Sequence, residues 1–188
     1  MAAIGLRNVK YGKYGVVEGV ISYTGSRLMG AAISADLSIE VAEAILYTND
    51  GEDEVVKEFA GGQLSIGVKE LDYTTQSDLL GHTKTDAVGE VPESLLANAD
   101  DSAAPAGVGF VVPVMRDGAK KFRAIFLTKV TFGEPTLSFK TKEKTITFAT
   151  PTTVGTVQRD YNGDWKDESI HANEADANDW IDTKLSIV

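Results

Sequence analysis

Residues 121–132 read KFRAIFLTKVTF, and this stretch decides the fold. Written as a strand, it places alternate side chains on opposite faces of a sheet. One face then carries Phe122, Ala124, Phe126, Thr128, Val130 and Phe132, which is an ordinary core face. The other face carries Ile125 and Leu127 between Arg123, Lys129 and Thr131. Water is a poor partner for those aliphatic side chains, so we expect the second face to be covered as well.

Further strand signals surround this stretch. GVGFVVPVM precedes it, and the Asp117-Gly118 pair between the two runs is a strong hairpin signal. Ala31 to Ile39 alternates, which predicts Ile33, Ala35, Leu37 and Ile39 on an inner face. Additional strands are expected at Ala44 to Thr48, in QLSIGVKEL, and in the pair KTITFAT and TTVGTVQ.

Two segments have a helical period instead. TTQSDLLGH is typical of a short helix, with Thr74 or Thr75 as its N-cap and Gly81 at its end. ANEADANDWIDTKL places Ala177, Trp180, Ile181 and Leu185 on one stripe. We therefore predict a mainly β (α+β) fold in one domain, residues 1–188: a β-sandwich or partly closed barrel of antiparallel strands, with one short internal helix and a C-terminal helix.

Two polar stretches interrupt this pattern and are expected to be loops. Residues 49–62 begin after Thr48 with an acidic run, and Gly61 and Gly62 give this loop freedom to rearrange. Residues 83–106 contain mainly small, acidic and proline residues around Leu95 and Leu96. A stretch of that length between regular elements is uncommon in a compact domain and usually has a function.

The charge is unevenly distributed. The chain has a formal net charge of −10, yet residues 116–144 hold eight Lys and Arg against three acids. This asymmetry indicates either salt bridges across the surface of one molecule or a basic region that meets an acidic region of another copy. An acidic protein is not expected to hold nucleic acid tightly, because such binding uses clustered Lys and Arg.

The sequence contains little that predicts catalysis. It has no Cys, which excludes disulfides and thiolate metal sites, and its two histidines, His82 and His171, are expected to be surface or capping residues. Nucleophile elbows, zinc helices and phosphate loops are absent, and GVGFVV is better explained as the tightly packed start of a strand. We predict no catalytic, cofactor-binding or metal-ligating residues, and we expect no enzyme activity.

The acidic clusters fit calcium ligation less well than solvated loops. Asp50 to Glu54, and Asn162 with Asp164, do not follow the twelve-residue spacing of an EF-hand. The N-terminal sequence does not resemble a secretory signal, and no run approaches the roughly 20 apolar residues that span a bilayer. We therefore expect a chain made in the cytosol that does not insert into membranes.

The strand block VGFVVPVMRDGAKKFRAIFLTKVTFGEPTLSFKTKEKTITFATPTTVGTV resembles the major tail proteins of phages with long non-contractile tails. The similarity extends upstream through GLRNVKYGKY, GAAISADLSIEVAEAILYTND, LSIGVKEL and LLGH, and downstream through NGDWKDE. It covers nearly the whole chain. Its specificity comes from several segments in the same order, since none of them is a catalytic motif.

This resemblance implies a structural role in the virion. Proteins of that family form rings, commonly hexameric, which stack into a tail tube around a tape-measure protein and later let double-stranded DNA pass. The implied partners are other copies of the chain, the tape-measure protein, and the tail-terminating and tail-tip proteins, with assembly in the host cytoplasm. DNA would pass without sequence-specific binding, along a wall on which acids outnumber bases.

The resemblance also assigns roles to the polar stretches. We expect loops 49–62 and 83–106 to be assembly arms that contact the next ring; their candidate residues are Asp50, Glu52, Asp53, Glu54, Gly61, Gly62, Glu90, Glu93, Asp100 and Asp101. The candidate basic face between subunits consists of Arg116, Lys120, Lys121, Arg123, Lys129, Lys140, Lys142 and Lys144. Acids of residues 160–182 in the next subunit are its expected partners. The second face of 121–132 would be covered partly by the terminal helix and partly by another subunit.

Two other readings remain open. One is a different ring-forming virion or secretion component, such as a tail terminator, a head decoration protein or a type VI secretion tube-like protein. The other is a soluble β-sandwich module that binds carbohydrate or peptide. The second reading would predict aromatic residues gathered at one loop end, whereas the six tyrosines are scattered along the chain.

Overall fold

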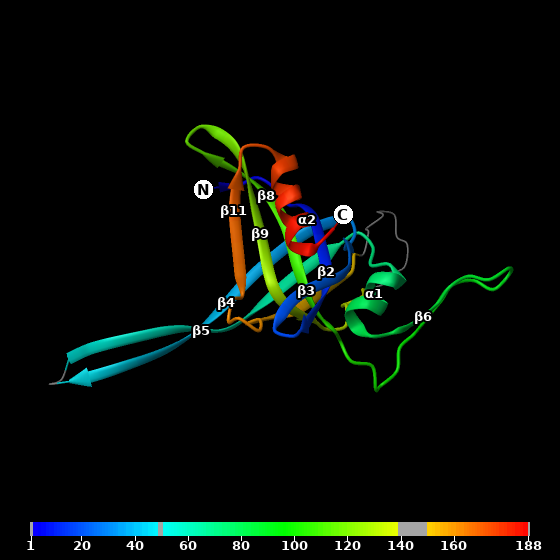
Figure 1. Ribbon diagram of the computed structural model, residues 1–188, viewed down its shortest axis with the longest axis horizontal. Coiled ribbons are helices and arrows are strands. Elements are labelled where there is room, and N and C mark those ends of the chain that lie inside the picture. The colour runs from blue at the N-terminus through cyan, green and yellow to red at the C-terminus, as the bar shows by residue number, and fades with distance from the viewer. Residues whose placement is uncertain (1, 49–50, 139–149, 188) are drawn as a thin grey trace, which may run out of the picture.

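The computed structural model describes residues 2–48, 51–138 and 150–187 (Figure 1). Within these ranges, nine strands form one antiparallel sheet, whose main path runs β3-β2-β8-β9-β10-β5-β4. These strands are β2 (Arg7–Val17), β3 (Val20–Leu28), β4 (Ala32–Thr48), β5 (Gly51–Val68), β8 (Pro105–Arg116), β9 (Ala119–Phe132) and β10 (Thr152–Gln158). β1 (Ala2–Ala3) adds to β8, and β11 (Lys166–His171) adds to β9.

The sheet folds over to enclose the main core. Leu64 and Ile66 of β5 are fully buried in one cluster with Val9 of β2, Val108 of β8 and Leu127 of β9. Because β5 and β2 are separated by three strands along the sheet, they share a cluster only if the sheet curls. The predicted mainly β fold of antiparallel strands with two short helices is confirmed, and one curled sheet replaces two separate ones.

β9 lies at the centre of the sheet and contains a β-bulge. Ala106 is opposite Val130, whereas Val108 is opposite Leu127, so β9 has one more residue than β8 between these pairs. Before the bulge, Leu127 packs in the main core and Phe126 packs in a second cluster on the other face. After the bulge, Val130 packs in the main core with Leu127, whereas strict alternation would place it with Phe126. The predicted alternation is therefore wrong beyond Thr128, because an extra residue exchanges the two faces of a strand.

The terminal helix α2 (Glu174–Leu185) covers the outer face of β8 and β9. Ala177, Ile181 and Leu185 are buried against Ala124 and Phe126, as the predicted stripe requires. The opposite face of β9 packs into the main core. Both faces of this strand are thus covered within one chain, but by other elements than predicted. α2 lies on the face of Ala124 and Phe126, and the curled sheet covers the face of Ile125 and Leu127, where the helix was expected. Contact of β9 with another subunit stays a prediction.

The short helix α1 (Tyr73–Leu80) closes one end of the core with Leu79 and Leu80. Its N-cap is Asp72, whose side chain accepts a hydrogen bond from the Thr75 backbone N–H at 2.6 Å, and not Thr74 or Thr75 as predicted. Asp72 lies directly before the first helical residue, Tyr73, and its carboxylate has the reach of a capping side chain. Gly81 ends the helix with a φ of 83°, as expected.

The predicted loop 49–62 is wrong for residues 51–62. β4 and β5 form one long hairpin, and their pairing runs from Ala32↔Val68 to Thr48↔Gly51. Gly61 and Gly62 lie within β5, opposite Glu40 and Ile39, and not at a flexible joint. The polar run therefore continues the strand. Pairing with β4 satisfies its backbone, and its polar residues leave no apolar alternation for the sequence to reveal.

Residues 83–106 are only partly a loop. β6 (Thr83–Thr85) and β7 (Ser94–Leu96) pair with each other, and a further bridge joins Val88 to Val91 near the turn. Residues 105 and 106 already belong to β8. We call residues 83–104 the second arm, and residues 41–48 with 51–59 of the β4/β5 hairpin the first arm. The two arms project from different ends of the molecule (Figure 1).

Candidate assembly surfaces

The first arm exposes apolar side chains on both of its faces. Val41 lies opposite Phe59, and Val55 is an even number of residues from Phe59, so Val41 and Val55 share one face. Val56 lies opposite Ala44 on the other face. The three valines are about half exposed, at 55%, 45% and 47%. Among the described side chains of the arm, Phe59 at its base is partly buried, whereas Val41, Val55 and Val56 leave both faces accessible to a partner.

The base of the first arm is held by an aromatic stack. The rings of Phe59 and Trp165 lie parallel, with centroids 4.6 Å apart and an interplanar angle of 8°. Arg159 lies over the Phe59 ring and donates a hydrogen bond to its backbone carbonyl, and Lys166 lies over Trp165. Trp165, just before β11, is thus a packing residue at the base of the arm. The stack joins the base of the arm to the segment before β11.

The second arm ends in an exposed apolar tip. Val88 and Val91 pair across the turn and are 73% and 62% exposed. Lys84 at its base pairs with Asp86 at 2.8 Å and lies 3.9 Å from Glu93. The hydrogen bond with Asp86 raises the pKa of Lys84. Two of the predicted stacking residues, Glu90 and Glu93, therefore lie on this exposed hairpin.

The other acidic candidates of this stretch lie at the arm's base. The Asp100 backbone N–H donates to the Asn98 side chain, and Asp101 accepts from the Asn98 backbone N–H at 2.8 Å. Glu52, Asp53 and Glu54 lie on β5, in the first arm. Asp50, Lys140, Lys142 and Lys144 are outside the described residues. The acidic candidates are thus divided between the two arms.

The basic candidates are split by the structure. Arg116, Lys120 and Lys121 gather at the β8/β9 turn, where Asp117 and Gly118 have positive φ angles, as the hairpin signal predicted. Arg123 instead pairs with Glu168 of β11 in the same chain at 2.6 Å, and this contact lowers the pKa of Glu168. Lys129 lies over the ring of Tyr14. The within-molecule explanation of the charge asymmetry therefore holds for Arg123.

Both ends of the main strand path lie open in the described part of the chain. β3 and β4 end the strand path, so each has a neighbour on one side only. β4 is 17 residues long, and Ile33 at its start is 56% exposed, contrary to the predicted inward position. A register shift between Ala32 and Ser34 explains this. A long open edge with exposed apolar side chains is the usual template for pairing with another chain.

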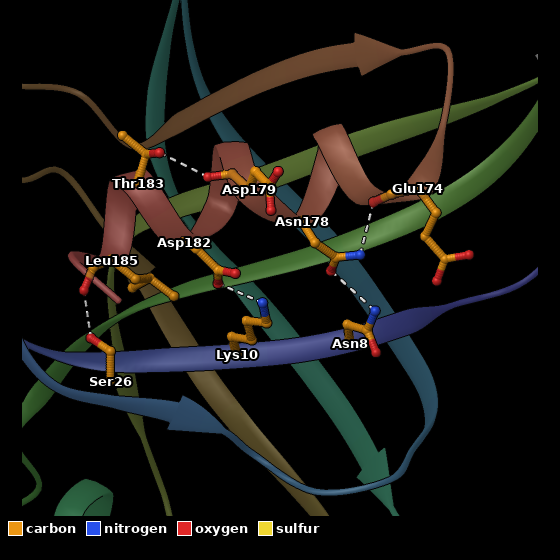
Figure 2. Close-up of polar contacts among 9 residues, drawn as sticks. All are labelled: Asn8, Lys10, Ser26, Glu174, Asn178, Asp179, Asp182, Thr183 and Leu185. Atoms are coloured by element: carbon orange, nitrogen blue, oxygen red, sulfur yellow. Dashed lines mark hydrogen bonds and ion pairs between the residues drawn. The ribbon is translucent and has the colours of Figure 1, made fainter. Parts of the chain in front are cut away.

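The α2 helix is anchored to the sheet by polar contacts as well as by its buried stripe (Figure 2). The Lys10 ammonium donates to Asp182, Asn8 donates to Asn178, and the Ser26 hydroxyl donates to the backbone carbonyl of Leu185. Sequence patterns gave no signal for these pairs, which join β2 and β3 to residues more than 150 positions away. They keep the helix attached to the sheet along its length.

Buried glycines allow this close approach. A Cβ at Gly107 would lie 2.4 Å from the Tyr23 ring, and one at Gly109 would lie 2.4 Å from Ile181 Cγ2. The prediction that GVGFVV is a tightly packed strand and not a dinucleotide loop is confirmed. Trp180 packs at the side of the same cluster.

His82 is not a surface residue, contrary to the prediction. It is 6% exposed and lies between Asp101 and Glu134, at 2.8 Å and 3.0 Å. The sequence missed this because neither carboxylate is a neighbour in the chain. His171 lies on β11, with its ring 6.3 Å from that of Trp180.

The described residues contain no group of three or more His, Asp or Glu side chains that could hold a metal ion. Asp160 accepts from the backbone N–H groups of Asn162 and Asp164, so this acidic run forms a closed turn. Of the helices in the described ranges, neither is long and apolar enough to cross a membrane. Comparison with known protein families and with curated proteins gives no match.

Proposed function

We propose that this protein is a structural component of a virion that assembles into stacked rings and forms the tail tube of a long-tailed, non-contractile phage. Its partners would be other copies of itself, the tape-measure protein and the proteins that close the two tail ends. Assembly would take place in the host cytoplasm. The resemblance of nearly the whole chain to major tail proteins supports this proposal, and the β4/β5 hairpin gives it a physical basis.

The observation that carries the proposal is the first arm. A two-stranded hairpin is marginally stable in water unless another layer packs on it. This arm leaves the sheet with Val41 and Val55 exposed on one face and Val56 on the other. Its outer β4 edge has no neighbour among the described strands. A second copy of the chain would cover both faces and that edge at once.

Charge favours contacts between copies in a fixed order. The sequence of the first arm includes Glu52, Asp53 and Glu54 on β5, whereas Arg116, Lys120 and Lys121 surround the β8/β9 turn. Complementary patches at different places on one molecule create head-to-tail contacts, which close into rings or continue as tubes. Because Arg116 and Lys120 are exposed, added salt should weaken the contact. An overall charge of −10 is also compatible with a tube that repels DNA and does not grip it.

Substitutions on the first arm test the proposal. Val55→Lys and Val56→Lys place a charge on opposite faces of the arm, far from the main core, and should leave the folded subunit intact. Val17→Lys, at the exposed β2/β3 turn, is the matched control. Light scattering and negative-stain microscopy across protein concentration should show rings or tubes for the wild type and the control, and smaller particles for the two arm variants.

Each alternative predicts a different outcome. Rings that never extend at any concentration would indicate a terminator or decoration protein. Self-assembly would be contradicted, and a binding module favoured, if the wild-type protein stays monomeric at every concentration and salt level and the amides of the first arm are already protected from hydrogen exchange in that monomer.

A further inference from the structure

His82 joins two parts of the molecule through two carboxylates. It follows Gly81 at the end of α1, and 5% of its side chain is exposed. Its Nδ1 lies 2.8 Å from Asp101 Oδ2, at the base of the second arm. Its Nε2 lies 3.0 Å from Glu134 Oε1, in the segment that follows β9. The imidazole ring therefore bridges the second arm and the main sheet.

Both contacts are satisfied only by a protonated ring. An ionised carboxylate accepts hydrogen bonds and cannot donate, so each nitrogen that faces one has to carry a proton. Imidazolium has two N–H groups, whereas neutral imidazole has one. The hydrogen bond with Asp101 raises the pKa of His82, burial opposes it, and Glu134 raises the pKa further. The net increase agrees with the geometry.

The two carboxylates are held unequally. Asp101 is 16% exposed, and the Asn98 backbone N–H, followed by His82, lowers the pKa of Asp101. Glu134 is 70% exposed and is readily solvated when its partner is lost. When the ring gives up a proton, the remaining N–H should stay with Asp101. The contact with Glu134 should open.

The surroundings determine which part is released. Gly133 donates its backbone N–H to Val154 at 2.9 Å, and Thr136 donates to Thr152 at 2.7 Å, so the backbone around Glu134 is fixed to the sheet. Among the described residues, Asp101 and Glu134 are the charged groups that face His82. Lys84, two residues later, directs its ammonium toward Thr74 and Asp86. Opening would therefore loosen the base of the second arm while the sheet stays in place.

We propose that His82 is a proton-operated latch that fastens the base of the second arm to the main sheet when protonated and releases it when neutral. The latch lies within one chain, so it does not depend on the proposed tube. Because the pKa of His82 is raised on folding, its contribution is complete below the ordinary value of about 6.5 and is lost as pH rises through the folded value. The contribution of Asp101 to stability depends on pH in the opposite way. Because its pKa is lowered on folding, this contribution is present above the ordinary pKa range of Asp and is lost in acid.

Nuclear magnetic resonance of the imidazole Cε1–H signals, from about pH 5 to about pH 9, tests the latch. The chain has two histidines, so the signal missing from His82→Gln is that of His82. We expect its titration midpoint to lie above the ordinary value of about 6.5 and to fall in both Glu134→Gln and Asp101→Asn. Glu93→Gln changes an acid on the same arm that does not face His82, and it should leave the midpoint unchanged.

Amide exchange of residues 97–103 gives the structural readout. The exchange rates of the wild type are compared with those of His82→Gln at each pH, which removes the intrinsic pH dependence of exchange. Relative to that variant, wild-type exchange should become faster as the pH rises through the titration midpoint of His82. A midpoint at or below the ordinary value that is insensitive to Glu134→Gln would overturn the proposal. So would a wild-type exchange profile that follows that of His82→Gln at every pH.

Discussion

Replacing Gly109 by alanine tests how closely α2 is held against the sheet. A Cβ at this position would lie 2.4 Å from Cγ2 of Ile181, whose side chain is fully buried. No normal contact between carbon atoms is that short, so α2 has to shift or β8 has to bend. Crowding of a well-packed site by one methyl group typically costs about 1–3 kcal/mol, and we expect a loss of stability in that range.

The partner substitution shows whether the two residues act on each other. Ile181→Ala removes the crowding Cγ2 atom, leaves a cavity, and should cost about 2–5 kcal/mol by itself. In the double variant the new methyl group of residue 109 enters part of that space. The two losses should therefore fall short of additivity by roughly 1 kcal/mol, within the range seen for residues in contact.

Urea unfolding followed by circular dichroism measures these free energies. The slope of the unfolding free energy against urea concentration should be the same in all variants, which shows that their unfolding transitions are comparable. Gly5→Ala is the control, because a Cβ at Gly5 meets no atom within 4 Å. The reasoning is refuted if Gly109→Ala is as stable as Gly5→Ala, or if the losses of the two single variants add fully in the double variant.

Three further predictions concern the other elements. Asp72→Ala removes the N-cap of α1 and should lower the free energy of unfolding by about 0.5–2 kcal/mol; an unchanged urea midpoint would contradict the cap. Phe59→Ala removes the stack with Trp165, so small-angle X-ray scattering should report a wider range of first-arm orientations, and an unchanged scattering profile would exclude this role. The hydrogen bond from Arg123 lowers the pKa of Glu168, so this carboxylate adds stability above the ordinary pKa range of Glu, and the stability is lost as the pH falls. Arg123→Met should therefore make the free energy of unfolding depend less steeply on pH in acid. An identical dependence in the wild type and the variant would rule this out.

Glu168 shows why charge patterns in the sequence do not reveal which basic side chains are paired within the chain. The sequence identified Arg123 as part of a basic run, and the turn residues Arg116, Lys120 and Lys121 do gather at one hairpin. Arg123 lies nearby but is paired across the β9/β11 ladder, where Ile170 is its directly opposite residue and Glu168 is two positions away. Ladder register depends on both strands, so one strand's sequence does not reveal it.

The length of the β4/β5 hairpin was also not predictable from its residues. Alternation indicated a strand where Leu37 and Ile39 are half-buried against the body. Beyond them, Glu43 pairs with Lys57, and residues 41–44 and 55–58 are exposed, so these residues have no buried face to give the sequence a period. Its strands extend because each satisfies the backbone of the other.

By itself the sequence determined the features that depend on neighbouring residues. Apolar alternation gave the β class, the 3.6-residue stripe gave α2, and Asp117-Gly118 and Gly81 fixed a turn and a helix end because they readily adopt positive φ angles. The tertiary structure decided the bulge in β9, the reach of the first arm and the burial of His82 between Asp101 and Glu134. Each of these depends on partners that are distant in the chain, and they become neighbours only when the whole sheet has curled around its core.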